Sequence, residues 1–386
     1  MAEYAFTDEQ GQLRTAVRKF CAENFDEQTV RQLMESDPPF DAKVWARLGS
    51  ELGVLGLSVP ENDGGVGGTL IDQAIAVEEL GASLACGPVF GTVFLVIPAL
   101  VAASAGQARD ELLAELVEGR RTAAFAVPDR AGTLGEVSVT ADGDALTGTV
   151  ERVVDAGAAD DLLVAARSGD GLTLYAVDAD AAGVQRHPLV TLDLTRPQAT
   201  VQLSGAPGRL VAGVGEAERV IEHALQVGSA LLAVEQVGAA QHLLDLSVDY
   251  AKSRLQFGRQ IGSFQAIKHK LADLLVDLEH ARSTSYHAVW ALADGSDDPA
   301  LSASIAQATC SAALSRIAAD TIQVHGGIGF TWEHQAHLYF KRATTDAALL
   351  GSAEQHRSRV AELVLDGLDG SAADRAPRVA DGTPAG

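Results

Sequence analysis

The chain has 386 residues, of which 47% are hydrophobic and 21% charged, and its net charge at pH 7 is −23. This length is sufficient for two or three domains with a sizeable core, and the composition is typical of a globular protein. The excess of acids excludes a nucleic-acid partner, because nothing in the chain could neutralise phosphates along a strand. Three cysteines, Cys21, Cys86 and Cys310, lie far apart without metal-binding spacing, which indicates a reducing compartment.

The chain shows no sign of export or of membrane insertion. Its first residues, MAEYAFTDEQ, carry acids where a signal peptide has basic residues and an apolar run, so we expect a cytoplasmic protein. The uncharged stretch from Gly81 to Ala108 is long enough to raise the question of a membrane span. Pro88 and Pro98 interrupt this stretch and no basic flank orients it, so it predicts a pair of helices buried in a core.

The hydrophobic pattern divides the chain into four parts. Residues 1–121 are predicted to form an N-terminal helical domain, because apolar residues such as Leu13, Val17 and Phe20 recur at spacings of three and four. Over residues 122–212, short β-prone runs separated by DG and GDG turn signals predict a middle, mostly antiparallel β domain. The helical period returns over residues 213–368, which predicts a C-terminal helical bundle. Residues 369–386 are small, polar and proline-bearing, which predicts a disordered tail.

The junction between two C-terminal helices has an unusual sequence, RLQFGRQIGSFQAIKHKLAD, at residues 254–273. Arg254 offers a planar fork of donors suited to a pair of phosphate oxygens. Phe257 and Phe264 offer apolar surface to a flat ring. An arginine at a helix end is also commonly a cap or a surface charge, so the residue alone does not define a site.

A second segment, QVHGGIGF, begins at Gln323 and has similar chemistry. Gln323 can both donate and accept hydrogen bonds, while Gly326 and Gly327 allow backbone N–H groups to approach an anion closely. A pair of glycines also commonly ends a helix. We expect no metal site here, because the HxxH pair of His334 and His337 is a weak signal and no Asp, Glu or Cys set completes it.

Three segments resemble signatures of the acyl-CoA dehydrogenase family, flavoenzymes that desaturate acyl-CoA thioesters between Cα and Cβ. They are GLSVPENDGGVGGTLIDQAIAVEELG (56–81), YAKSRLQFGRQIGSFQAIKHKLAD (250–273) and QVHGGIGFTWEHQAHLYFKRA (323–343). The resemblance runs nearly end to end and implies an α+β fold with an N-terminal helical domain, a β-barrel domain and a C-terminal four-helix bundle. It also implies FAD, an acyl-CoA substrate, electron-transfer flavoprotein as acceptor, and a role in lipid metabolism by β-oxidation chemistry.

The resemblance assigns one set of residues to the flavin. In the family, the matching positions reach the pyrophosphate and adenosine of the FAD that a neighbouring subunit holds, which implies an oligomer such as a tetramer. In this sequence the positions are Arg254, Gln256, Phe257, Ile261, Phe264, Gln323, Gly326 and Gly327.

The family's catalytic base has no counterpart in this sequence. Desaturation needs a carboxylate, shielded from water beside the thioester, that takes the α-proton while the flavin accepts the β-hydride. Most members place a Glu before the glycine of a YEGT motif, and the matching segment LLGSAEQHR places Leu350 there. Other members carry the Glu on the helix that leads into the Arg-x-x-Phe-Gly motif, where Gly228 stands in this chain. The catalytic residue is therefore unknown.

Three other acids lie near these two positions in the sequence. Glu235 is seven residues beyond Gly228, on the same helix face but about 10 Å further along, so a packing or interhelical contact is the favoured interpretation. Asp346 and Glu354 flank Leu350 at four residues on either side, displaced by about a helical turn.

The middle domain also departs from the family. The loop that should resemble TEPGAGSD reads AVPDRAGTLGEV (126–137), and the strand that should resemble WITN lies in ERVVDAGAADDLLV (151–164). Ala126, Val127, Val153 and Val154 therefore stand where Thr, Ser and Trp would face the flavin. The chain keeps residues that would complete a partner's flavin site and lacks many that would form its own.

These paired losses favour one of three functions. In the favoured hypothesis, the chain is the base-lacking subunit of a heteromeric acyl-CoA dehydrogenase, resembling the α2β2 enzymes of actinobacterial steroid and lipid catabolism. A second acyl-CoA dehydrogenase chain then supplies the base and most flavin contacts. The first alternative is a self-sufficient homotetramer with a displaced base. The second is a flavin monooxygenase-like relative, because those relatives also lack the Glu.

Overall fold

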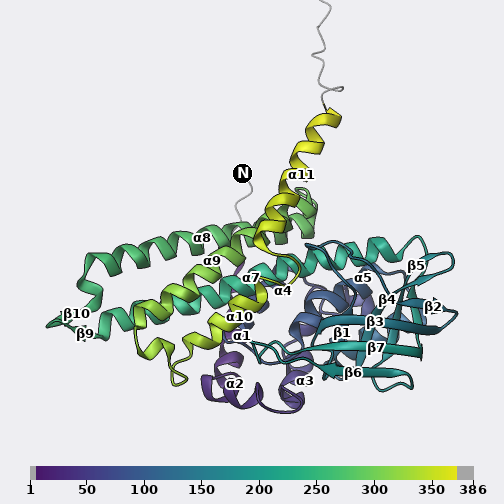
Figure 1. Cartoon of the computed structure of the whole chain (residues 1–386), viewed down its shortest axis with the longest axis horizontal. Helices are drawn as coiled ribbons and strands as arrows, with labels where there is room; N and C mark the ends of the chain where they lie inside the picture. The colour runs from purple at the N-terminus through teal and green to yellow at the C-terminus, as the bar shows by residue number, and fades with distance from the viewer. Residues whose placement is uncertain (1–5, 372–386) are drawn as a thin grey trace, which may run out of the picture.

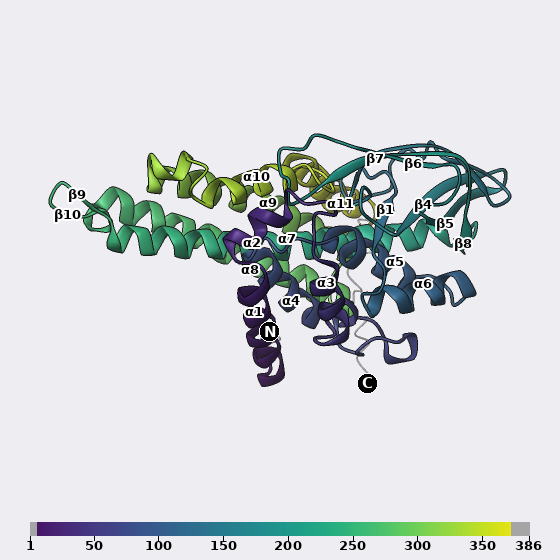
Figure 2. The same cartoon turned by 90° about the horizontal axis from the view of Figure 1, so that it is seen from below.

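The computed structural model describes residues 6–371, and the side chains of residues 6–365. A β-sheet lies at one end of the molecule, and the long C-terminal helices extend away from it (Figure 1). The N-terminal helices pack against the part of the bundle nearest the sheet (Figure 2). The predicted α+β class, with helical, β and helical parts in chain order, is confirmed.

The N-terminal part is helical, and side-chain caps begin three of its helices. Thr7 and Gln10 form a capping box, while Asp26 and Asp41 accept hydrogen bonds from backbone N–H groups of the first turns. The elements are α1 (Asp8–Asn24), α2 (Glu27–Leu33), α3 (Ala42–Ser50), η1 (Val54–Gly56), η2 (Glu61–Asp63), α4 (Leu70–Ala82), the π-helix η3 (Val89–Val96), α5 (Ile97–Ala102) and α6 (Gln107–Val117).

The uncharged stretch over residues 81–108 forms short helices inside the protein. All eight residues of η3 are buried, as are Ile97 to Leu100 of α5. In the part of the chain that the structure describes, no helix is long and apolar enough to cross a membrane. The interpretation of this stretch as buried helices is confirmed.

The middle part forms one twisted sheet in the order β6-β7-β3-β2-β4-β5-β8, with β1 added beside β4. Most neighbouring strands are antiparallel, as predicted, and only β1 and β2 pair with β4 in parallel. The DG signal marks the tight turn from β2 to β3, where Gly143 has φ +58°. The strands are β1 (Ala123–Ala126), β2 (Thr140–Asp142), β3 (Ala145–Val154), β4 (Asp161–Ser168), β5 (Gly171–Asp178), β6 (Val184–Pro188), β7 (Gln198–Pro207) and β8 (Arg209–Ala212).

The C-terminal part is a bundle in which α7, α8, α9 and α11 pack together. Its elements are α7 (Ala217–Ser253), β9 (Leu255–Gln256), β10 (Arg259–Gln260), η4 (Ile261–Ser263), α8 (Gln265–Asp294), α9 (Pro299–His325), η5 (Ile328–Phe330), α10 (Ala336–Asp346) and α11 (Ala353–Ser371). Helix α11 continues through residues 369–371, which the sequence assigned to a disordered tail. Residues 372–386 of that predicted tail lie outside the described residues.

Helices α4 and α7 cross with their backbones in contact. A Cβ atom on Gly238 would lie 1.9 Å from the carbonyl oxygen of Glu78, and one on Gly81 would lie 2.3 Å from the carbonyl oxygen of Glu235. Only glycine fits at both positions, because real Cβ atoms do not approach backbone atoms so closely. This crossing fixes the N-terminal helices on the bundle.

We therefore expect Gly238→Ala to destabilise the protein by about 3 kcal/mol, the upper range for an overpacked core site. Gly11→Ala is the matched control, because Gly11 also lies in a helix but nothing lies within 4 Å of its added Cβ. The control should be neutral or should stabilise by about 0.5–1 kcal/mol. Urea unfolding of the two variants measures the difference, and equal midpoints would contradict the close crossing.

Candidate active site

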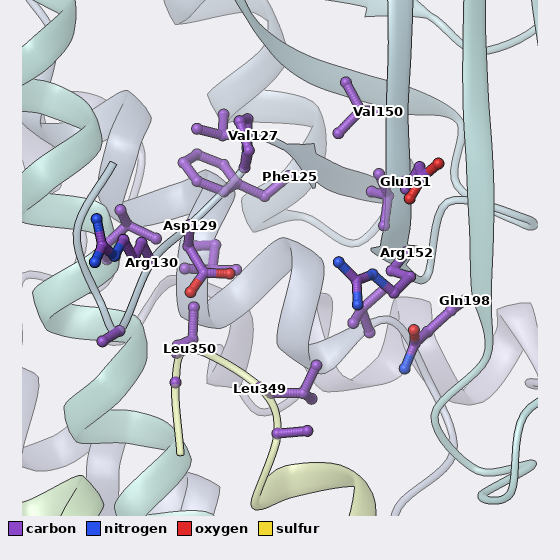
Figure 3. Close-up of a pocket in the computed structure, with 18 of the residues that line it drawn as sticks. Phe125, Val127, Asp129, Arg130, Val150, Glu151, Arg152, Gln198, Leu349 and Leu350 are labelled. Atoms are coloured by element: carbon purple, nitrogen blue, oxygen red, sulfur yellow. The ribbon is translucent and has the colours of Figure 1, made fainter. Parts of the chain in front are cut away.

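A cavity of about 740 Å³ lies where the sheet meets the helices (Figure 3). Its walls come from β1, β3, the loop after β1, η3, α7 and the turn between α10 and α11. Its buried apolar lining includes Phe90, Leu95, Phe125, Val127, Leu225 and Leu350. Exposed charged residues line the remainder: Asp129, Arg130, Glu136, Glu151 and Arg152.

The structure brings the two family base positions together at this cavity. A Cβ atom on Gly228 would lie 3.4 Å from Cδ1 of Leu350 and only 2.5 Å from Cδ2 of Leu95. The leucine side chains therefore fill the space that a longer side chain at residue 228 would need. Both positions lie at one apolar spot, and neither presents a carboxylate.

The backbone at Leu350 is held in an uncommon conformation. Its φ is +53°, a value that non-glycine residues rarely adopt. The His356 side chain donates from Nε2 to the Leu350 carbonyl oxygen over 2.8 Å, and His356 is itself buried. A Cβ on the next residue, Gly351, would lie 2.4 Å from Cα of Ala131. The turn that carries Leu350 is thus fixed against the loop after β1.

Asp129 on that loop is a carboxylate that the sequence analysis did not single out. Its side chain points toward Leu350 (Figure 3). Although Asp129 is exposed to solvent within the open cavity, the protein around its carboxyl partly desolvates it and raises its pKa, opposed by a hydrogen bond from the Gly132 backbone and by the charge of Arg152. In the sequence, Asp129 follows Pro128 in a pair of a kind that is common in turns and loops, so nothing there marks it as a functional residue.

The three substitute acids suggested by the sequence are not in the cavity lining. Glu235 is buried and pairs with two guanidinium groups: Arg196 Nη2 donates to its Oε2, and Arg342 Nη1 lies 3.4 Å from its Oε1. Asp346 belongs to the same buried cluster, with Arg196 Nη2 3.7 Å from its Oδ1. Glu354 is exposed at the start of α11. Glu235 therefore holds helices and loop together, as an interhelical polar contact does.

A second feature is the exposed tip formed by β9 and β10 at the far end of α7 (Figure 1). Arg254 caps α7 through its backbone, and its carbonyl accepts a hydrogen bond from the Ile261 N–H over 2.9 Å. Phe257 has φ +53° and a side chain that is 91% exposed. Its ring meets that of Phe264 edge to face at 6.1 Å. A strained backbone that presents an aromatic ring to solvent indicates a binding surface.

The segment after α9 lies at the same end of the bundle (Figures 1 and 2). The rings of Tyr250 on α7 and His325 on α9 stack at 4.4 Å, which places the two helix ends side by side. Gln323 is exposed, and Gly326 and Gly327 have nothing within 4 Å of an added Cβ. The residues that the sequence assigned to a partner's flavin are therefore gathered at one exposed end.

The histidines near this segment make ring contacts and protein hydrogen bonds. His325 Nδ1 donates to the Thr321 carbonyl oxygen at 2.8 Å, and its ring also meets that of His334 at 4.3 Å. Burial lowers the pKa of both rings. Among the residues that the structure describes, no group of three His, Cys, Asp or Glu side chains is arranged to hold a metal ion.

The cavity and the tip lie far apart in one subunit. Gly228 and Arg254 are 26 positions apart along α7 and its cap, which corresponds to about 39 Å at 1.5 Å per residue. Since one continuous helix separates them, Arg254 cannot reach the cavity of its own chain.

Comparison with known proteins identifies the family. A model of the acyl-CoA dehydrogenase N-terminal domain matches residues 7–120, and one of the C-terminal domain matches residues 218–365. The chain therefore belongs to the acyl-CoA dehydrogenase family, whose members are oxidoreductases with FAD as cofactor.

Relatives cover the chain almost completely. It is 36% identical to the acyl-CoA dehydrogenase IpdE2 of Mycolicibacterium smegmatis, over 92% of this chain and 98% of the relative. Among solved structures, it resembles a chain of the ChsE4-ChsE5 complex from Mycobacterium tuberculosis, with a TM-score of 0.85 and 28% identity over 94% of this chain and 99% of that chain. It also resembles a chain of the Tcur3481-Tcur3483 steroid ACAD, with a TM-score of 0.84 and 29% identity over the same shares.

The two features fit FAD unequally. The tip offers the exposed Arg254 fork, an exposed aromatic ring and open glycine backbone, which suit a pyrophosphate and an adenine. The four positions expected to face the ring are buried apolar side chains without donors: Val127, Val153 and Val154, which line the cavity, and Ala126, which does not. The charged lining of the cavity also has three exposed carboxylates and two guanidinium groups. This excess of negative charge disfavours a negatively charged ligand.

The ion pairs of Glu235 allow structural and chemical roles to be separated. We expect Glu235→Gln to cost about 3–5 kcal/mol of stability, because it removes the paired carboxylate of the buried Arg196 and one of the two carboxylates at Arg342. Turnover per folded, flavin-loaded assembly should stay within a few-fold of the parent, whereas loss of a general base costs about 10²–10⁴-fold. Glu354→Gln, at an exposed acid, is the control and should change neither quantity. A hundredfold loss of turnover with intact flavin content would assign the base to Glu235.

Proposed function

We propose that this chain is the base-lacking subunit of a heteromeric FAD-dependent acyl-CoA dehydrogenase. In this proposal a second chain of the same family binds FAD and supplies the carboxylate that removes the α-proton of the acyl-CoA thioester. Two structural relatives come from assemblies of two proteins, ChsE4-ChsE5 and Tcur3481-Tcur3483. These assemblies support a partner of the same kind for this chain.

The separation of about 39 Å between the Gly228 position and Arg254 carries the proposal. A flavin-binding tip that cannot reach the cavity of its own subunit is useful only to another subunit. The cavity of this chain, in turn, has leucines at the base positions and valines at the expected flavin face. The tip is therefore the part of the chain that contributes to catalysis.

The residues of the tip have distinct roles in this arrangement. The Arg254 guanidinium donates two hydrogen bonds to phosphate oxygens of the partner's cofactor. Phe257 covers apolar surface of the same molecule, and Gln323 with the N–H of Gly327 supplies further polar contacts. FAD, when bound, supplies the acceptor for the β-hydride.

One observation favours the self-sufficient enzyme as a second candidate. Asp129 places a carboxyl at the cavity, pointing toward Leu350, and partial desolvation raises its pKa. If the lone chain turns over acyl-CoA, Asp129 is the first residue to test as the displaced base. Its hydrogen bond from the Gly132 backbone N–H favours instead a role in shaping the loop.

The first test concerns the cofactor. We expect Arg254→Ala to weaken FAD binding by the complete assembly about 10–100-fold, because a charged hydrogen bond to phosphate contributes about 1.5–3 kcal/mol. The measurement is flavin absorbance per assembly after dialysis over a range of protein concentrations. Lys252→Ala is the matched control, since Lys252 is an exposed cation at the same helix end whose ion pair is with Asp249. Unchanged flavin content in Arg254→Ala would contradict the role of the tip.

The second test concerns assembly. Expressed alone, the chain should bind little FAD and show little acyl-CoA:acceptor activity, because its own cavity lacks the flavin-face donors and the base. Co-expressed with a Glu-bearing family member, it should purify as a heterotetramer with fewer flavins than subunits. Light scattering and flavin absorbance measure both quantities. Full flavin loading and turnover by the lone chain would restore the homotetramer.

A further inference from the structure

A buried cluster of charges joins the middle and C-terminal parts of the chain and contacts the cavity wall at Phe90. It contains two guanidinium groups, from Arg196 and Arg342, and four carboxyls. Arg196 and Asp193 belong to the loop between β6 and β7, Glu235 to α7, Asp346 to α10, and Asp155 follows β3. The carboxyls are those of Asp155, Asp193, Glu235 and Asp346.

Three of the four carboxyls have hydrogen-bond donors. Asp193 accepts from Arg342 Nε at 2.8 Å and from the Thr195 backbone N–H at 2.9 Å. Glu235 accepts from Arg196. Asp155 accepts from the Gly91 backbone N–H at 2.9 Å. Each of these three carboxyls thus has at least one hydrogen-bond donor inside the cluster.

Asp346 is the exception. It is 1% exposed, and neither of its carboxyl oxygens has a hydrogen-bond partner. The nearest cation is Arg196 Nη2 at 3.7 Å, which already donates to Glu235. The Nε–H of Arg196 is also buried and without an acceptor. The Asp346 carboxyl therefore lies just beyond hydrogen-bond distance of a guanidinium that pairs with Glu235 and keeps one N–H without an acceptor.

We propose that Asp346 is a proton-operated switch that sets the position of Arg196 and thereby the shape of the cavity wall. With its proton, Asp346 is neutral and Arg196 remains on Glu235. Without it, the Asp346 carboxylate competes with Glu235 for the same guanidinium. Because the guanidinium of Arg196 lies 5.1 Å over the Phe90 ring, and Phe90 lines the cavity, movement of Arg196 changes that wall. This inference does not depend on the proposed partner.

The groups around Asp346 determine the direction of the effect. Burial raises the pKa of Asp346 to about 7, with Arg196 and Arg342 lowering it and Glu235 and Asp193 raising it. Burial also raises the pKa of Asp155 to about 6. Cys86 and Tyr339, beside Arg342, stay neutral because burial raises the pKa of both. The raised pKa of Asp346 stabilises the folded chain at low pH. This contribution to the free energy of unfolding is lost as the pH rises to about 7.

Hydrogen–deuterium exchange of the full chain between pH 5.5 and 8.5 tests the switch. After correction for intrinsic exchange, protection of residues 89–96 and 189–197 should fall up to about tenfold per pH unit as the pH rises from 5.5 to about 7, and should level off above about 7, where Asp346 is ionised in every state. In Asp346→Asn, which keeps the shape but cannot ionise, protection should not change with pH, and the gain in melting temperature over the parent should grow as the pH rises to about 7 and then stay constant. Asp155→Asn should retain most of the pH dependence, and Asp249→Asn, at an exposed acid, should retain all of it.

Two results would overturn the proposal. One is an equal pH dependence of protection in the parent and in Asp346→Asn. The other is unchanged protection of both segments in the parent itself across the pH range, which decides the matter even if Asp346→Asn fails to fold. If Asp155→Asn, rather than Asp346→Asn, removes the pH dependence, the switch is assigned to the wrong carboxyl.

Discussion

The buried pairing of Arg342 and Arg196 with Asp193 and Glu235 is the interaction that holds the middle part of the chain on the C-terminal bundle. Arg342 on α10 binds Asp193 and Thr195 of the loop between β6 and β7, and the same cluster reaches α7 through Glu235. Desolvating these charges is costly, so removal of one partner from the Arg342–Asp193 pair or the Arg196–Glu235 pair would destabilise the cluster. The cavity lies between the elements that the cluster joins, and its walls are therefore set by ionic contacts beneath it rather than by apolar packing alone.

This cluster also explains the reversed polarity of the loop between β6 and β7. Asp193, Thr195 and Arg196 are buried there, although polar side chains are usually outside. The apolar side chains of the same segment face solvent: Leu189, Val190, Leu192 and Leu194. Polar and apolar side chains alternate along this loop, as they do in a strand. Because the groups that the loop contacts inside the protein are guanidinium and carboxylate groups, its polar side chains face inward. Hydrophobic patterning alone would assign the opposite face to the core.

The sequence predicts the fold and the tip well because both depend on local signals. Helical periodicity, DG turns and capping residues are short-range features, and Arg254 and Phe257 lie where a helix visibly ends in the sequence. The cluster could not be predicted, since its ion pairs join residues that are 39 to 150 positions apart and each residue has an ordinary local explanation. Asp129 was missed for a related reason: only the close approach of Gly351 to Ala131 brings its loop to the turn that carries Leu350.

The packing around the two family base positions, and not only the residue types there, disfavours a catalytic carboxylate. A side chain at residue 228 would collide with Leu95, and the Leu350 turn is fixed by the His356 hydrogen bond and by contact with the loop after β1. An acid at residue 350 would meet the same apolar neighbours and no guanidinium partner at that spot, so burial would hold it neutral. The tip, by contrast, keeps its cation, its strained aromatic residue and its open glycines exposed. The proposed division of labour between two subunits would account for both conditions in one chain.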